Sequence, residues 1–513
     1  MNIADRRARP DHLRVVHVLQ QRAGVLGLVG RNDQALQDLG RGLWLAVRLK
    51  DRKSEADCLM GLSETYSATG QYDEMMRTAQ GSLAIYQELG DRRGQAASFN
   101  NIGFVLTNRG EYDQALEFFR RSLEIKRQTG DLQGQAVSHN NLGFIRHSRG
   151  DFGPALEDYA LALELYRQVG DRDSQADTMI NIGFIHNLGG RPGEALEYFQ
   201  PALAIKREIG DRQGQANCLA NIATARGTMG QGREALESYR QTLEIFREIG
   251  SRRGQATILI NLGHLHGRMG EYHQALEHLE ASLGLWRELK DRKGQSGACN
   301  NLGLVRLGMG DLELAREDFG RALEMGRELA DLRGQALSLV GIGRALLEQG
   351  DQDGARRHLS QAEELARKAG DREGLRRARL SLGELNLAEH GPGRLEEARG
   401  LAEQARQLAD PQRGPAGLAE ALLLLARVDA AQGLISQAEE GLARAQELFG
   451  QCGYLPEAAR AEYHLARLLQ AGGEVRRSRE LLERAAAAFE RMGARSWLAR
   501  SRAAINGEGR DED

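Results

Sequence analysis

The chain has 513 residues, of which 41% are hydrophobic and 27% are charged, a balance typical of folded soluble proteins rather than disordered ones. Its 69 Lys and Arg residues against 72 Asp and Glu residues leave a net charge of -3, which argues against a nucleic-acid partner. Glycine is abundant, at 62 residues, whereas proline is rare, at 8, so the glycines do not come from Pro/Gly-rich linkers.

The cysteines and the apolar runs bear on the cellular environment. The four cysteines lie far apart and form no CxxC pair, which disfavours a disulfide framework and favours a reducing compartment. The first residues are polar, and no run of 18 apolar residues occurs, so we expect neither a secretion signal nor a membrane span. The sequence therefore predicts a cytoplasmic protein with no membrane partner.

The main feature of the sequence is a repeat with a period of 40 residues. Glycines recur at positions 30, 70, 110, 150, 190, 230, 270, 310 and 350. Aspartates recur at 51, 91, 131, 171, 211, 291, 331 and 371, with Ser251 in the gap, and glutamines recur at 95, 135, 175, 215, 255, 295 and 335. The excess of glycine is thus explained by turns at fixed positions.

Each repeat predicts two helices, as the unit that begins at Asp91 illustrates. The Asp91 carboxylate can accept hydrogen bonds from the free amides of a helix N-terminus. A first helix, helix A, would run to about Arg109, and Gly110 suits the left-handed residue that ends it. Helix B would cover about residues 112–129 and end at Gly130. Nothing in the unit alternates with a period of two, which disfavours strands.

Both helices carry an apolar stripe that predicts stacking of the units. On helix A the stripe comprises Phe99, Ile102, Gly103 and Leu106, and on helix B it comprises Ala115, Phe119, Leu123 and Ile125. Such spacing marks one buried face, and we expect Gly103 to let helix B approach closely at Ala115. One hairpin cannot bury both of its faces, so neighbouring hairpins must stack on each other.

The period loosens after Gly370, but hairpins continue. Residues 375–391 pair with 394–409, residues 418–433 with 435–450, and residues 457–473 with 475–493. A final helix near residues 494–505 would cap the array, and the tail 507–513 is expected to be disordered. We therefore predict a regular array over 12–370, degenerate hairpins and a capping helix over 371–506, and an acidic tail over 507–513.

The pattern resembles a tetratricopeptide repeat (TPR) of the long, 40-residue type. The resemblance is carried by Phe99, Asn101, Ile102, Gly103, Gly110, Tyr112, Ala115, Phe119 and Leu123, and it is clear over residues 51–370 and weaker over 12–50. This form is similar to Pins-type adaptors, kinesin light chains and bacterial TPR proteins. The resemblance implies an all-α, right-handed superhelical solenoid of about twelve antiparallel hairpins, in which positions on helix A line a concave groove. The fold hosts many partners, so it predicts function only weakly.

A row of asparagines would face that groove. Its members are Asn101, Asn141, Asn181, Asn221, Asn261 and Asn301. An amide offers both a donor and an acceptor, so the row could hold the backbone of an extended peptide without demanding a particular sequence. The alternative is that each amide only bonds the neighbouring helix.

The next groove position would give selectivity. Phe104, Phe144 and Phe184 occupy it in three consecutive repeats, where they would anchor apolar side chains. The alternative is that these rings pack between neighbouring helices. In a later repeat the same position holds His264, and Arg268 and Arg344 would make that part of the groove more basic. We therefore expect a ligand segment with apolar residues at one end and an acidic group nearer the other.

The sequence offers no signature of catalysis, so we predict no catalytic residue, no metal site and no cofactor. It contains no GxxxxGK[ST], GxSxG or HExxH motif. His264 and His266 lie two residues apart on a helix and so point to different faces. Cys218 and Cys299 lie near the core stripe, and we expect them to be buried and inert.

The predicted function is a non-enzymatic scaffold that binds a partner protein or an extended peptide in its concave groove. The alternative is a regulatory or sensor subunit of a separate signalling enzyme, such as an ATPase, a CHAT-type protease or a kinase. A pull-down that recovers a catalytic protein would favour the alternative. The sequence does not predict an oligomeric state.

Overall fold

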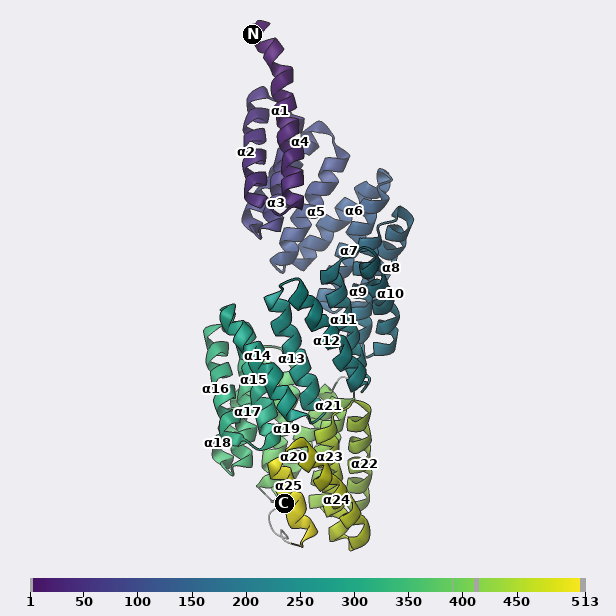
Figure 1. Cartoon of the computed structure of the whole chain (residues 1–513), viewed down its shortest axis with the longest axis vertical. Coiled ribbons are helices and arrows are strands. Elements are labelled where there is room, and N and C mark those ends of the chain that lie inside the picture. Colours follow the sequence, from purple (N-terminus) through teal and green to yellow (C-terminus); the bar gives the residue numbers. More distant parts are fainter. Residues whose placement is uncertain (1–2, 390, 410–414, 508–513) are drawn as a thin grey trace. The chain divides into compact units, whose positions relative to one another are not determined.

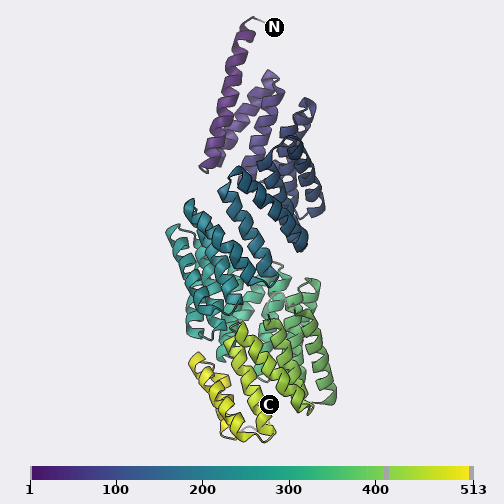
Figure 2. The same ribbon diagram turned by 90° about the vertical axis from the view of Figure 1, so that its right-hand side faces the viewer.

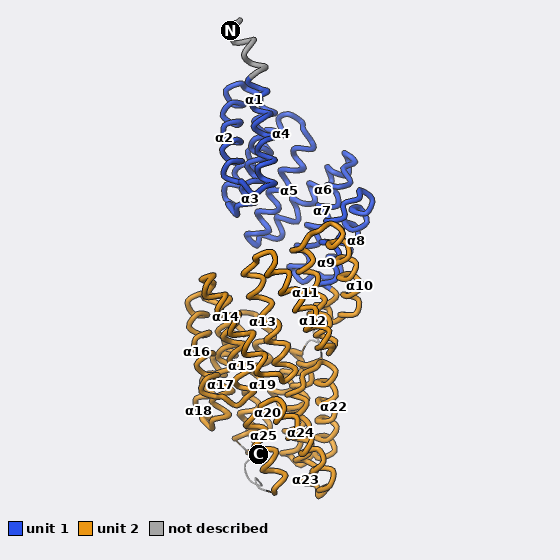
Figure 3. The backbone as a smooth tube through the Cα atoms, viewed as in Figure 1, with its two compact units in different colours: residues 1–185 blue, residues 186–513 orange. Residues whose placement is uncertain are grey.

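The computed structural model describes residues 3–389, 391–409 and 415–507, and all regular elements within these ranges are α-helices. The predicted all-helical hairpin fold is thereby confirmed, with twelve consecutive hairpins followed by a single last helix. The chain divides into two compact units, unit 1 at residues 1–185 and unit 2 at residues 186–513 (Figure 3). Apart from Gly507, the predicted tail 507–513 lies outside the described residues, and the predicted division at residue 370 stays a prediction.

Unit 1 contains the first helices of the array (Figure 1). They are α1 (Ile3–Leu28), α2 (Asn32–Leu49), α3 (Arg52–Ala68), α4 (Tyr72–Leu89), α5 (Arg92–Asn108), α6 (Tyr112–Gln128), α7 (Leu132–Arg149), α8 (Phe152–Val169) and most of α9 (Arg172–Leu188). The odd-numbered helices correspond to helix A of each repeat, and the even-numbered helices correspond to helix B. The predicted bounds of the unit at Asp91 agree with α5 and α6 to within about two residues.

Unit 2 contains the remaining helices. They are α10 (Pro192–Glu208), α11 (Arg212–Thr228), α12 (Gly232–Glu248), α13 (Arg252–Arg268), α14 (Tyr272–Glu288), α15 (Arg292–Met309), α16 (Leu312–Glu328), α17 (Leu332–Glu348), α18 (Gln352–Lys368), α19 (Arg372–Ala388), α20 (Pro392–Leu408), α21 (Ala416–Ala431), α22 (Ile435–Gln451), α23 (Leu455–Ala471), α24 (Val475–Met492) and α25 (Arg495–Ile505). Each helix packs mainly on its neighbours in the chain, as in a stack of hairpins.

The recurring residues define where each helix begins and ends. The Asp91 carboxylate accepts a hydrogen bond from the backbone amide of Gly94, 3.0 Å away, and so caps α5 as predicted. Gly110 has φ 76°, the left-handed conformation that a glycine adopts without strain. These two devices recur along the array, which explains why the helix bounds repeat with the period of the sequence.

The recurring glutamines have a role that the sequence did not reveal. The side chain of Gln95 donates to the backbone carbonyl of Tyr86, 3.1 Å away, at the end of the preceding α4. Gln215, Gln255, Gln295 and Gln335 make the same contact with the carbonyls of Lys206, Phe246, Trp286 and Gly326. Each glutamine therefore satisfies a carbonyl at a helix C-terminus and ties one hairpin to the next.

The glycines inside the A helices make room for large side chains of the B helices. A Cβ added at Gly103 would lie 3.0 Å from the ring of Phe119. Gly143 receives Tyr159 in the same way, at 2.9 Å. The close approach predicted at Gly103 exists, but its nearest neighbour is the Phe119 ring rather than Ala115. The helix spacing therefore depends on one small residue facing one large residue.

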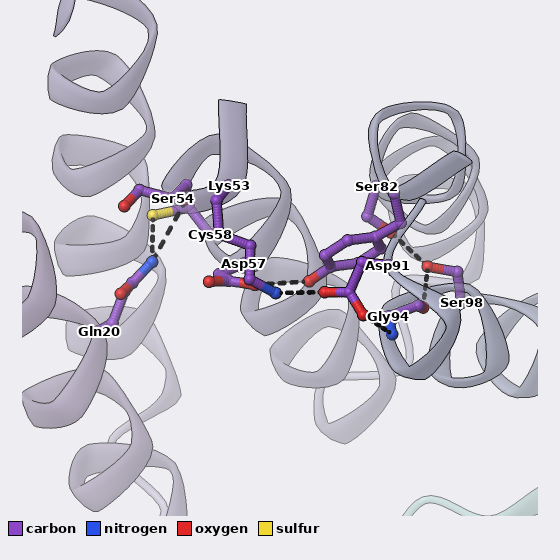
Figure 4. A network of polar contacts seen from close by, with 10 residues as sticks. Gln20, Lys53, Ser54, Asp57, Cys58, Ser82, Asp91, Gly94 and Ser98 are labelled. Atoms are coloured by element: carbon purple, nitrogen blue, oxygen red, sulfur yellow. Dashed lines mark hydrogen bonds and ion pairs between the residues drawn. The ribbon is translucent and has the colours of Figure 1, made fainter. Parts of the chain in front are cut away.

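Polar contacts also join successive hairpins in unit 1 (Figure 4). Lys53 of α3 forms ion pairs with Asp57 of its own helix, at 3.0 Å, and with Asp91 at the start of α5, at 2.6 Å. The Tyr86 hydroxyl donates to the Asp57 carboxylate, 2.7 Å away, and Gln20 of α1 donates to the Cys58 sulfur, 3.2 Å away. The stack is thus held by side-chain bonds as well as by apolar packing.

Unit 2 coils far enough for its last helices to pack against its earlier ones (Figures 1 and 2). Leu279 and Trp286 of α14 share one apolar core with Tyr463 of α23 and Phe489 of α24. Asp311, before α16, forms an ion pair with Arg495 of α25, which lies 184 residues later. The C-terminal hairpins therefore pack against α14 and α15 of the same unit.

Candidate binding surfaces

The asparagine row of unit 1 lies half-buried on the A helices and is partly used within the protein. The Asn101 amide donates to the Met60 sulfur and to the Ser63 hydroxyl of α3, both 3.2 Å away. The Asn141 amide donates to the Asn100 side chain of α5, 3.0 Å away. These two asparagines therefore join neighbouring A helices, which was the alternative interpretation of the row. Within the described residues, we find no hydrogen bond from the Asn181 side chain.

The three phenylalanines of the next position are exposed. The exposed fractions are 37% for Phe104, 47% for Phe144 and 39% for Phe184, and no core cluster contains them. The Phe104 ring lies 6.4 Å from that of Tyr72, and the Phe184 ring lies 5.4 Å from that of His147. We call Phe104, Phe144 and Phe184 the phenylalanine row. Large apolar side chains exposed at regular intervals are suited to binding another chain.

The residues that were predicted to form the basic end of the groove lie in unit 2, and their environment differs from that of the exposed phenylalanine row. His264, Arg268 and Asn301 line a cavity of about 690 Å³, which we call the unit 2 cavity. The Asn301 amide donates to the Gly297 carbonyl of its own helix, 2.8 Å away. Asn221 and Asn261 are half-buried and do not line this cavity. The asparagine row therefore does not present one uniform surface in unit 2.

The unit 2 cavity has walls from two separate parts of the chain. One wall consists of α13, α15, α17 and α19, and the other includes residues of α21, α23 and α25. Arg268 links the two walls, because it donates to the Gly227 carbonyl, 3.0 Å away, and to the Cys452 carbonyl, and lies over the Tyr454 ring. The protein's own C-terminal hairpins thus cover this part of the inner face.

Several charged side chains in the cavity form hydrogen-bonded ion pairs with one another. Arg376 is almost fully buried and bonds the carboxylates of Glu373, at 2.7 Å, and Glu420, at 2.5 Å. Burial opposes ionisation of Glu373, but Arg376 and Arg377 lower its pKa to about 2. His264 lines the cavity, where desolvation by the surrounding walls lowers its pKa to about 4, with the charges of Arg268 and Arg377 adding to the effect.

His266, His278 and the cysteines lie in surroundings that indicate structural rather than catalytic roles. His266 is buried, with its Nδ1 2.5 Å from the Glu271 carboxylate and its ring stacked on His278. Within the described residues, no three His, Cys, Asp or Glu side chains are arranged to hold a metal ion. All four cysteines are buried and form no disulfide with one another, and burial raises the pKa of the Cys58 thiol to about 11, against a hydrogen bond from Gln20. Such thiols are poor nucleophiles.

No helix in the described part of the chain combines the length and the apolar character that a membrane crossing requires.

A family model described as "Tetratricopeptide repeat" matches seven overlapping windows of the chain, which together span more than half of it. The windows are residues 54–128, 94–168, 134–208, 174–248, 214–288, 254–328 and 295–368. Two similar solved structures are the apo form of RapI, with 17% identity, and BtubC (BKLC) from P. vanneervenii, with 18% identity. The RapI match covers 54% of this chain and 98% of that chain with a TM-score of 0.44, and the BtubC match covers 42% and 91% with a TM-score of 0.39. No curated protein matches the chain.

Proposed function

We propose that this chain, which belongs to the tetratricopeptide repeat family, is a non-enzymatic cytoplasmic scaffold that binds an extended segment of a partner protein along the A helices of unit 1. The observation that carries the proposal is the exposure of Phe104, Phe144 and Phe184 at intervals of 40 residues. Their rings supply apolar anchors, and the Asn181 amide is available to a peptide backbone.

The contacts of the asparagines refine how such a segment would bind. Asn101 and Asn141 already donate to neighbouring helices, so their amides would have to exchange a bond within the protein for one with a ligand. Such an exchange contributes little net free energy. We therefore expect the phenylalanine row to supply most of the affinity, with the asparagines setting the spacing of the A helices.

The first experiment identifies the bound segment. A photoreactive phenylalanine analogue placed at position 144 is irradiated in lysate, and the crosslinked peptides are sequenced by mass spectrometry. The same analogue at Leu161 of α8, which is 50% exposed on a B helix, is the matched control. We expect one protein to be crosslinked at position 144 through a single short segment and not at position 161. If the captured protein is an enzyme whose activity changes on binding, the regulatory-subunit alternative is favoured.

The second experiment measures the affinity of the identified segment as a synthetic peptide. We expect Phe144→Ala to weaken binding by at least about tenfold, because a buried aromatic anchor is worth about 1–2 kcal/mol or more. Leu161→Ala should leave the affinity unchanged. If the double variant Phe144→Ala, Asn181→Ala binds as tightly as the unmodified chain, the proposed surface is wrong.

A further inference from the structure

The unit 2 cavity has the dimensions of a small-molecule site rather than of a peptide groove. Its volume of about 690 Å³ lies within the range of roughly 300–1,000 Å³ that is common for such sites. The C-terminal hairpins form one of its walls, so an extended chain cannot run along this inner face as it could along an open groove. A compact ligand is therefore the kind of molecule that the space accommodates.

The lining carries more cationic than anionic groups. Seven arginines and six carboxylates face the cavity. Within the described residues, five of these arginines form no ion pair with a carboxylate, namely Arg268, Arg333, Arg344, Arg372 and Arg460. The Nε atoms of Arg268 and Arg460 are, in addition, buried without a hydrogen-bond partner. Arg268 is half-buried and bonds only backbone carbonyls among the described residues, and such a guanidinium group favours an anionic ligand.

The carboxylates do not cancel this excess. Glu373 and Glu420 are engaged by Arg376, and Glu373 also by Arg377. The other four are Glu348, Asp371, Glu384 and Glu457. Burial raises the pKa of Glu457, against the opposing effect of Arg460, so this carboxylate carries its charge less readily.

Arg268 and His264 lie one turn apart on α13, and both line the cavity. The Arg268 guanidinium also lies over the ring of Tyr454, which precedes α23, 4.3 Å from the ring centroid. The hydrogen bonds of Arg268 go to backbone carbonyls, which leave its charge uncompensated. Leu304 and Val340, from the two intervening A helices, add apolar surface to the same cavity.

We propose that the unit 2 cavity binds a small organic anion, whose carboxylate or phosphate group lies against Arg268 and His264 on α13 and whose apolar part faces Leu304 and Val340. This site is separate from the phenylalanine row and does not depend on the function proposed for it. Its occupation would bridge the two walls, since Arg268 belongs to one of them and contacts Cys452 and Tyr454 beside the other.

The proposal is tested by calorimetric titration of the full chain with 2-naphthoate, 1-naphthyl phosphate and the neutral 2-naphthylmethanol. We expect one or both anions to bind at least about tenfold more tightly than the alcohol, because only an anion gains the charge-assisted bonds to arginine. The preferred anion distinguishes a carboxylate ligand from a phosphate ligand. Equal affinity for the alcohol, or no binding of either anion at millimolar concentration, overturns the proposal.

Variants locate the site. We expect Arg268→Gln to weaken anion binding by about tenfold and Leu304→Trp, which fills the cavity, to abolish it. Arg357→Gln, an exposed arginine of α18 outside the cavity, is the matched control. If both cavity variants bind the anion as the unmodified chain does, the proposed site is wrong.

A second measurement uses the unmodified chain, so it does not depend on whether a variant folds. The His264 ring signal is followed by NMR during a pH titration of the unmodified chain with and without the anion. An anion beside the imidazole stabilises its protonated form, so we expect the pKa of His264 to rise from about 4 toward its ordinary value. An anion that binds without moving this pKa lies elsewhere, and the proposed position is then wrong.

Discussion

At the scale of single residues, Lys126 carries a positive charge whose burial lowers the stability of the folded state. Its ammonium group is buried and donates to the Ser138 hydroxyl, 3.0 Å away. Burial lowers the pKa of Lys126 to about 8, against the opposing effect of Asp131. Below pH 8 both the folded and the unfolded chains carry this proton, and the folded chain bears the cost of burying the charge.

We predict that Lys126→Met stabilises the protein at pH 7. The pKa difference between the folded and unfolded states corresponds to a penalty on the order of 3 kcal/mol, part of which is offset by the loss of the Ser138 bond. The folded chain releases the proton near pH 8 and the unfolded chain near 10.5, so the penalty disappears as the pH rises through that window. Urea unfolding at pH 7 and pH 10.5 measures both limits.

Lys206 provides the matched comparison, since it occupies the equivalent position 80 residues later. It is buried as well, but its ammonium group forms an ion pair with Asp211, 3.1 Å away. Lys206→Met leaves Asp211 without that partner, so it should stabilise the protein less than Lys126→Met does. A gain from Lys126→Met that does not change between pH 7 and pH 10.5 would contradict the explanation by buried charge.

At the scale of helices, the small residues that face large ones control the spacing between neighbouring helices. A Cβ added at Gly294, in the first turn of α15, would lie 2.3 Å from the Trp286 ring of α14. That ring is 5% exposed, so its neighbours leave it little room to move. The contact is therefore between a rigid ring and the backbone of the next helix.

We predict that Gly294→Ala destabilises the protein by about 1–3 kcal/mol, the usual cost of overpacking a core. Gly297→Ala, three residues later on the same helix, should instead stabilise it by about 0.5–1 kcal/mol, because nothing lies within 4 Å of the added Cβ and alanine favours the helix. Thermal unfolding monitored by circular dichroism measures both. Equal effects at the two positions would refute the role assigned to the Trp286 contact.

The elements themselves could be predicted from the sequence because their signals are local. The Asp91 cap and the Gly110 turn depend on residues within a few positions of the helix ends, so the periodic pattern was sufficient to place α5 and α6. The exposure of Phe144 also followed from its position on the helix. The sequence left open whether Asn101 and Asn141 bond a neighbouring helix or a ligand, because the answer depends on the exact spacing of the A helices.

At the scale of the whole chain, the closure of unit 2 could not be predicted. Each contact between adjacent hairpins changes the direction of the stack slightly, and only the sum over several hairpins brings Arg495 beside Asp311. No local pattern in the sequence indicates how these small changes of direction add up. The sequence therefore predicted a basic stretch of open groove at Arg268 and Arg344, whereas these residues line a cavity with a second wall.

Closure should make helices that are distant in sequence unfold together. In an open stack a defect weakens only the neighbouring hairpins, since each hairpin contacts its neighbours alone. In unit 2 the ring of Phe489, which is 1% exposed, belongs to the same core as Leu279 of α14 and Leu302 of α15. A cavity made at Phe489 therefore opens the core on both walls.

We predict that Phe489→Ala costs about 3–5 kcal/mol and speeds amide hydrogen exchange in α14 and α15 as well as in α23 to α25. Phe119→Ala is the control, because the core around Phe119 contains buried residues between 75 and 145 with Tyr66 and Tyr72 packed against it, and faster exchange should stay within α3 to α7. Hydrogen exchange read by mass spectrometry locates both effects. If Phe489→Ala loosens the C-terminal helices while α14 and α15 exchange as before, the two walls are not one cooperative core.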